Sequence, residues 1–148
     1  REGERERAYQ TDRGESIEKT ASSQPHQKTQ RLYRQAMISA PKLDGRLRAV
    51  VDNIEGEVVA DIGCDHGKVA VCALAEKRVV KAIACDISSK SLDKAVALAK
   101  SYAIEGIEFR CGDGLKPIAD GEADCIVIAG MGGKEIMSIL STMPKGIK

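Results

Sequence analysis

The chain has 148 residues, of which 43% are hydrophobic, and this is enough to fill the core of one ordinary domain. Its formal net charge is +1, and residues 43–148 taken alone are slightly acidic, which excludes a uniformly basic nucleic-acid-binding surface. No apolar run approaches the roughly 18 residues that a membrane span needs, and residues near the N-terminus lack the apolar core of a signal peptide. We therefore expect no membrane association.

The cysteine pattern argues against metal and disulfide chemistry. No two of the five cysteines are spaced as a CxxC pair, no histidine cluster lies nearby, and the odd count is unsuited to a disulfide framework: they are Cys64, Cys72, Cys85, Cys111 and Cys125. We expect no metal site and a reducing, cytoplasmic location.

Residues 1–36 contain few apolar residues and no sustained period, so they cannot bury enough surface to offset the entropy of ordering. This segment is predicted to be a disordered tail. Met37 directly precedes the first segment with structural character. We take Met37 as the natural start, with residues 1–36 not native and residues 37–148 forming a partial Rossmann-like domain.

From Leu43 onward, apolar residues recur at a helical spacing that predicts a leading helix, namely Leu43, Leu47, Val50, Val51 and Ile54. Strands are then predicted at 57–62, 80–86, 107–111 and 123–129, and helices at 68–77, 89–102 and 133–140, with Ser88 or Ser89 capping the second of these helices. Alternating strands and helices predict a parallel α/β sheet, here in the order 3-2-1-4. Because an open doubly wound sheet usually has about six strands, we expect the C-terminal strands to be missing.

The segment EVVADIGCDHG, residues 57–67, is typical of a strand that ends at a ligand-binding loop. Gly63 and Gly67 let backbone approach a ligand, and the helix that starts near Lys68 offers free N–H groups. Nineteen residues beyond Gly67, the second strand ends on Asp86, where a carboxylate can accept the hydroxyl protons of a ribose. The pattern predicts a nucleotide-like cofactor.

Asp65 distinguishes between two such cofactors. It stands where the second glycine of the dinucleotide template GxGxxG belongs, and a carboxylate there would repel a pyrophosphate. S-adenosylmethionine carries a cationic sulfonium, an ammonium and no phosphate, so the loop favours it over NAD. With equal weight, Asp65 is expected to cap the helix that begins at Lys68.

Two further glycine-rich segments follow the third and fourth strands. Asp113 lies between Gly112 and Gly114 and can accept a hydrogen bond from an adenine amino group. The segment AGMGG at 129–133 can let a planar base come close to a methyl donor, although Met131 is equally well interpreted as core filler.

Four motifs carry a resemblance to a known family: PKLDGRL at 41–47, DIGCDHG at 61–67, GDGL at 112–115 and above all IVIAGMGG at 126–133. Over residues 41–141 the chain resembles the bacterial tRNA (adenine-N1)-methyltransferases that modify the adenine at tRNA position 22. The resemblance implies a Rossmann-like class I methyltransferase fold, S-adenosylmethionine as cofactor and tRNA as partner. Members of this family have serine in place of Cys64, and they continue into the rest of the sheet and an added helical domain implicated in tRNA binding.

The resemblance also implies roles for individual residues. Gly130 and Met131 would border the target base as the catalytic pair. The residues expected to bind the cofactor are Asp61, Gly63, Cys64, Asp65, Gly67, Asp86, Ile87, Asp113 and Gly114. The alternatives are another class I methyltransferase, an NAD-linked oxidoreductase, and an inactive module that binds nucleotide or RNA.

Overall fold

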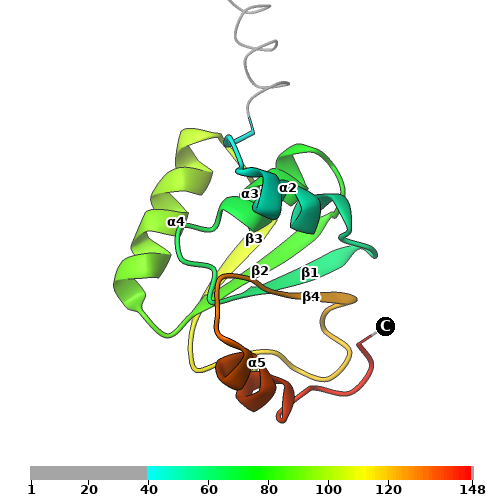
Figure 1. Ribbon diagram of the computed structural model, residues 1–148. Coiled ribbons are helices and arrows are strands. Elements are labelled where there is room, and N and C mark those ends of the chain that lie inside the picture. The colour runs from blue at the N-terminus through cyan, green and yellow to red at the C-terminus, as the bar shows by residue number, and fades with distance from the viewer. Residues whose placement is uncertain (1–39, 148) are drawn as a thin grey trace, which may run out of the picture.

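The computed structural model describes residues 40–147, so the predictions for residues 1–36 and for Met37 lie outside the described residues. In chain order, the elements within these residues are α2 (Gly45–Asp52), β1 (Val58–Ile62), α3 (Lys68–Ala75), β2 (Lys81–Asp86), α4 (Ser89–Ser101), β3 (Ile107–Cys111), β4 (Cys125–Ile128) and α5 (Gly133–Leu140), and Figure 1 shows their arrangement. The predicted bounds of β3 and α5 agree with the structure, and those of the other strands, α3 and α4 differ by at most two residues at an end.

The four strands form one parallel sheet in the order β3-β2-β1-β4, which confirms the predicted order. In the central pair, Val59 of β1 lies beside Ala82 of β2, and on its other side β1 pairs with β4 through Val59 and Cys125. Within residues 40–147, β4 pairs with β1 alone. Its other edge is therefore open in the described part of the chain.

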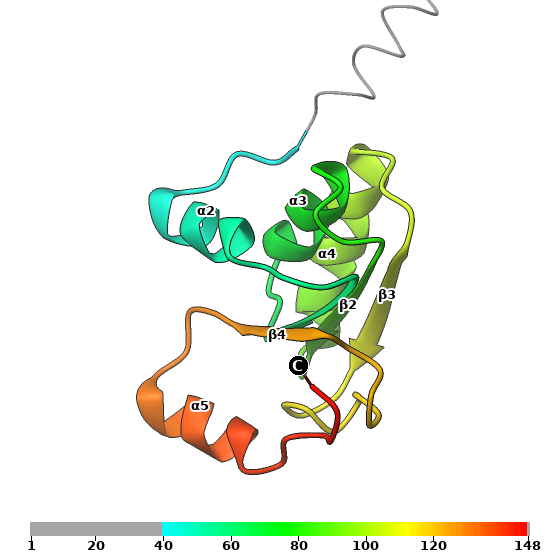
Figure 2. The same cartoon turned by 90° about the vertical axis from the view of Figure 1, so that its right-hand side faces the viewer.

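Alternate residues of the strands point to opposite faces of the sheet, and each face has its own apolar cluster. Val59, Ala82 and Ala84 pack with residues of α2, α3 and α4, and these three helices lie together on one side in Figures 1 and 2. Ala60, Ile62, Ile83 and Cys85 pack on the other face against Leu115, Ile118 and Ala123, with Ile139 of α5 at the margin. Burial on both faces explains why the central strands are mostly apolar.

Helices α3 and α4 both pack against the central strands, and α4 has a side-chain cap at its start. Val69 to Ala73 of α3 are all buried, so this helix is a core element. Helix α4 is capped by Ser88, whose hydroxyl accepts a hydrogen bond from the Ser91 N–H at 3.3 Å, and it buries Leu92, Ala95 and Ala99. The predicted serine cap is thus confirmed, at Ser88.

The cysteines divide by burial. Cys64, Cys72 and Cys85 are buried, Cys125 is half-buried and Cys111 is exposed, and all five are free thiols. Among residues 40–147 no group of histidine, cysteine and carboxylate side chains is arranged to hold a metal ion. No helix in the same range is long and apolar enough to span a bilayer.

Candidate functional site

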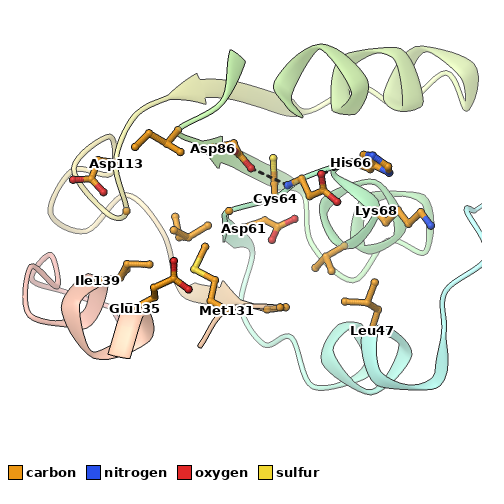
Figure 3. Close-up of a pocket in the computed structure, with 18 of the residues that line it drawn as sticks. Leu47, Asp61, Cys64, His66, Lys68, Asp86, Asp113, Met131, Glu135 and Ile139 are labelled. Carbon is orange, nitrogen blue, oxygen red and sulfur yellow. Dashed lines mark hydrogen bonds and ion pairs between the residues drawn. The ribbon is translucent and has the colours of Figure 1, made fainter. Parts of the chain in front are cut away.

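A cavity of about 620 Å³ lies at the carboxyl ends of the strands, the edge at which open parallel sheets bind ligands (Figure 3). Its wall is formed by the loops that follow all four strands, with α2 on one side and α5 on another. Ten of the eleven residues that the sequence singled out line it: Asp61, Gly63, Cys64, Asp65, Asp86, Ile87, Asp113, Gly114, Gly130 and Met131. The structure thus brings together residues that are up to 70 positions apart in the sequence.

Gly67 is the exception, because it lies outside the cavity wall. Its φ of +67° is in the left-handed region, and a Cβ added to it would lie 2.8 Å from the Cβ of Ala95 on α4. Its N–H donates a hydrogen bond to the Cys64 carbonyl at 2.7 Å, which closes the turn after β1. Glycine at this position therefore serves the packing of the loop on α4.

The expectation that Asp65 caps α3 is wrong. The N-cap of α3 is Gly67, with no side-chain hydrogen bond to the helix. The Asp65 carboxylate is 71% exposed and lies 3.7 Å from His66 Nε2. Residue 65 itself has a φ of +47°, a conformation that aspartate tolerates better than most residues. This leaves Asp65 on the cavity wall with its charge directed to solvent.

Asp61, the fourth residue of β1, is the buried charged group of the site. It is 3% exposed, it accepts a hydrogen bond from the Ala70 N–H in the first turn of α3, and its Oδ2 has no hydrogen-bond partner within residues 40–147. Burial raises the pKa of Asp61 to about 7, the Ala70 hydrogen bond opposes this, and the nearby charge of Asp86 adds to it. An unsatisfied carboxylate oxygen beside a cavity is a favourable partner for a cationic or hydrogen-bond-donating ligand.

Asp86 is held in place by two backbone groups. Its Oδ2 accepts a hydrogen bond from the Asp65 N–H at 3.0 Å, and its Oδ1 accepts one from the Ser88 N–H at 2.8 Å. The carboxylate thereby connects the loop after β1 to the start of α4 (Figure 3). Each oxygen retains a second lone pair, so the fixed carboxylate can still accept from a ligand. Next to it, Ile87 is 72% exposed and offers an apolar surface to the cavity.

Asp113 and Gly114 form the other end of the cavity (Figure 3). The Asp113 carboxylate pairs with Lys116 Nζ at 2.6 Å on the surface. Gly114 has a φ of +56°, and a Cβ there would lie 3.2 Å from Ile139 of α5. Helix α5 therefore closes this end of the cavity.

Met131 reaches across the cavity from the loop after β4. A Cβ added to Gly63 would overlap the Met131 methyl carbon, so the thioether lies directly over the loop after β1 (Figure 3). Met131 belongs to neither apolar cluster of the sheet. The structure therefore places it at the cavity and not in the core.

Cys64 is a neutral thiol in this wall. Burial raises its pKa far above the ordinary value, and the neighbouring carboxylates Asp61 and Asp86 raise it further. Because the thiolate is the reactive form, this side chain is unsuited to nucleophilic chemistry. It contributes a small, weakly polar surface.

Carboxylates outnumber cations on the cavity wall. Those present are Asp61, Asp65, Asp86, Asp113 and Glu135, against the cations Arg46 and Lys68 and the histidine His66. The orphaned oxygen of Asp61 and this acidic excess fit a cationic, phosphate-free cofactor and are unsuited to a pyrophosphate.

Sequence reasoning missed the contributions of α2 and α5 to the wall. Leu47 comes from α2, and Glu135, Ser138 and Ile139 come from one face of α5. The spacing of Glu135, three residues after Gly132, is a recognisable helix-start signal, and its Oε2 does accept a hydrogen bond from the Gly132 N–H at 3.2 Å. That signal gives the start of α5, whereas its position across the cavity depends on tertiary packing.

The fold and this site define a Rossmann-like domain with a nucleotide-type crevice at the carboxyl edge of its sheet. A family model described as a methyltransferase domain matches residues 43–148. The chain therefore belongs to the methyltransferase-domain family.

Comparisons with individual proteins point to a narrower group within this family. The tRNA (adenine(22)-N(1))-methyltransferase of Bacillus subtilis is 43% identical over 101 residues, covering 67% of this chain and 42% of the relative. The crystal structure of the B. subtilis m1A22 tRNA methyltransferase TrmK has a TM-score of 0.64 at 40% identity, covering 68% of this chain and 44% of that one. M. capricolum TrmK in complex with S-adenosylhomocysteine has a TM-score of 0.65 at 29% identity, covering 71% and 49%.

These findings confirm the resemblance that the four motifs indicated, with TrmK proteins as the matching relatives. The chain spans less than half the length of each of these three proteins.

Proposed function

We propose that this chain is the donor-binding part of an S-adenosylmethionine-dependent enzyme that methylates N1 of an adenine in tRNA, at position 22. The observation that carries the proposal is the carboxylate-rich cavity with the unpaired, buried oxygen of Asp61. Two relatives support the proposal: a tRNA (adenine(22)-N(1))-methyltransferase that is 43% identical, and a similar TrmK structure that holds S-adenosylhomocysteine.

The residues on the wall can be assigned to parts of such a donor. Asp61 and Asp65 provide negative charge at the end where a sulfonium and an ammonium would lie, and Asp86 would accept from the ribose hydroxyls. Ile87 would pack against the adenine ring, and Asp113 would accept from its amino group. When bound, S-adenosylmethionine supplies a methyl group that its sulfonium makes electrophilic.

The acceptor base would enter beside Gly130 and Met131. Adenine N1 has its lone pair in the ring plane, so no strong general base is needed, and these residues act by alignment and by exclusion of water. Because N1 is occupied in Watson–Crick pairs, the base must be unpaired or extruded, at a cost of a few kcal/mol.

We propose a cytoplasmic location on the ground that the proposed substrate is tRNA.

The proposal is tested in two steps. In the first, calorimetry measures S-adenosylmethionine binding to the wild type, Asp86→Ala and the control Asp93→Ala, an exposed carboxylate on α4. We expect Asp86→Ala to lose at least about tenfold in affinity, as loss of hydrogen bonds to a charged group predicts, and Asp93→Ala to bind like the wild type. Unchanged affinity in Asp86→Ala would defeat the ribose assignment.

In the second step, tRNA transcripts with adenine or guanine at position 22 are incubated with the protein and the donor, and their nucleosides are mapped by mass spectrometry. We expect 1-methyladenosine only in the transcript that has adenine at that position. A full-length version of the protein that binds the donor and still leaves both transcripts unmodified would refute the proposed reaction. Binding of NADH in place of S-adenosylmethionine would favour the oxidoreductase alternative.

A further inference from the structure

Glu135 is a carboxylate of the cavity that the donor assignments above do not use. It lies in the first turn of α5, four residues after Met131, and Figure 3 shows it between Met131 and Ile139. The other four acidic residues of the wall, Asp61, Asp65, Asp86 and Asp113, belong to β1, β2 or the loops after β1 and β3. Glu135 therefore places negative charge on the side of the cavity next to the Gly130–Met131 loop.

One oxygen of Glu135 is engaged and the other is free. Oε2 accepts the hydrogen bond from Gly132 N–H at 3.2 Å, which fixes the side chain against the helix start. Within residues 40–147, Oε1 makes no hydrogen bond or ion pair. A carboxylate held through one oxygen in this way presents the other at a defined position, without the entropy loss that ordering a free side chain would require.

We propose that Glu135 is a specificity-determining residue that binds the amino group of the target adenine and stabilises the cationic methylated base. This inference deepens the proposed function and rests on it. The inference rests on three observations about Glu135: its Oε1 is free, it lies beside Met131, and it is placed on the β4–α5 side of the cavity.

The chemistry of N1 methylation requires a group of this kind. The N1 lone pair forms the new N–C bond, the electron pair of the broken C–S bond stays on sulfur, and no proton leaves. Positive charge thereby passes from the sulfonium to the adenine ring, whose exocyclic amino group becomes a stronger donor. A carboxylate that accepts from that amino group gains a charge-assisted hydrogen bond as the charge develops, and this favours the product side of the reaction.

The same carboxylate discriminates between purines. Adenine presents a donor at its 6-position, which Oε1 can accept. Guanine and hypoxanthine present an oxygen acceptor there, which would face the carboxylate with no hydrogen atom between them. The mismatch leaves polar groups unpaired in the cavity, and enzymes reject such analogues strongly.

A purely structural role at the helix start is the competing explanation, and Glu135→Gln separates the two. The glutamine amide oxygen can accept from the Gly132 N–H, so the helix start is preserved while the negative charge is lost. Glu105→Gln is the matched control, since Glu105 is exposed in the turn before β3 and does not line the cavity.

The test titrates the protein, saturated with S-adenosylhomocysteine, with 1-methyladenosine, adenosine and inosine, and follows binding by NMR. We expect Glu135→Gln to weaken 1-methyladenosine binding at least about threefold more than adenosine binding, because both bases lose a hydrogen bond to the carboxylate but only the methylated base is a cation and also loses the attraction to its charge. In Glu135→Gln, the affinity for inosine should rise relative to the affinity for adenosine. The thermal midpoint should match that of the wild type, and Glu105→Gln should change none of these values.

Equal losses for 1-methyladenosine and adenosine, or no loss for either, would overturn the inference. So would a wild-type protein that binds S-adenosylhomocysteine but no 1-methyladenosine. A wild type that fails to bind S-adenosylhomocysteine overturns both this inference and the proposed function. Retained cofactor binding with unchanged nucleoside affinities in Glu135→Gln overturns the inference alone.

Discussion

Replacing Asp61 by asparagine should make the free protein more stable at pH 8 and change its stability little at pH 5. Burial raises the pKa of Asp61 from 3.8 to about 7, so the folded chain binds this proton more tightly than the unfolded chain does. The contribution of Asp61 to stability is therefore greatest at low pH. It declines as the pH rises from about 4 to about 7 and is constant above that range.

The size of the effect follows from the shift. About three pKa units correspond to about 4 kcal/mol by which the ionised, buried Asp61 destabilises the fold above pH 7. Asparagine removes the charge and can keep the hydrogen bond from Ala70, but its NH₂ group replaces the unpaired Oδ2 and leaves a donor unsatisfied, at about 1–3 kcal/mol. The net gain at pH 8 is expected to be about 1–3 kcal/mol, or roughly 4–8 °C in the thermal midpoint for each kcal/mol.

Urea unfolding of the wild type and Asp61→Asn at pH 5, 6, 7 and 8 measures this directly. The difference in the free energy of unfolding between the two proteins should shift by about 3 kcal/mol in favour of Asp61→Asn between pH 5 and pH 8. Asp93→Asn, an exposed carboxylate change on α4, should follow the wild-type curve. Parallel curves for the wild type and Asp61→Asn would show that Asp61 does not titrate in this range, and the electrostatic account of the site would fail.

Three further predictions concern the surrounding structure. Arg110 and the Ala119 N–H lower the pKa of Glu122 to about 2. The contribution of Glu122 to the stability of the fold is therefore present above pH 4.5 and is lost as the pH falls toward 2. In urea unfolding, Glu122→Gln should destabilise the protein by about 1–3 kcal/mol at pH 7 and not at all near pH 2. Gly67→Ala should destabilise the fold by about 2–4 kcal/mol, because residue 67 has a positive φ and its new Cβ would meet Ala95. Gly121 has a similar φ but lies in open space, so Gly121→Ala should destabilise the fold by only about 1 kcal/mol. Equal effects at both glycines would contradict the contact with α4. Met131→Ala should tighten S-adenosylmethionine binding about two- to fivefold by calorimetry, because the side chain no longer has to leave the space over the loop after β1; weaker binding would mean that it supports the donor instead.

The parts of the site that sequence reasoning located are those set by local chain geometry. Gly63 directly follows β1 and Asp86 is the last residue of β2, and a parallel sheet brings the carboxyl ends of its strands to one edge, so their proximity needed only the strand order. The bounds of β3 and α5 came from the same kind of local pattern.

The properties that the sequence did not reveal depend on packing between distant segments. The cap of α3 by Gly67 follows from the close contact of that loop with Ala95 of α4, which no local preference encodes. The pKa of Asp61 depends on how completely α3 covers it, and the approach of Glu135 depends on where α5 lies relative to the sheet. Such features require the spatial arrangement of three or more elements at once.

The thioether of Met131 over Gly63 has a consequence for the speed of ligand entry. An unbranched side chain with three rotatable bonds changes rotamer within picoseconds to nanoseconds when it is not tightly enclosed, whereas rearrangements of a chain segment take far longer. Residue 131 is half-buried, so a molecule arriving at this end of the cavity can displace one side chain while the peptide backbone stays where it is. Capture should then be limited by diffusion and desolvation and not by the opening of a lid.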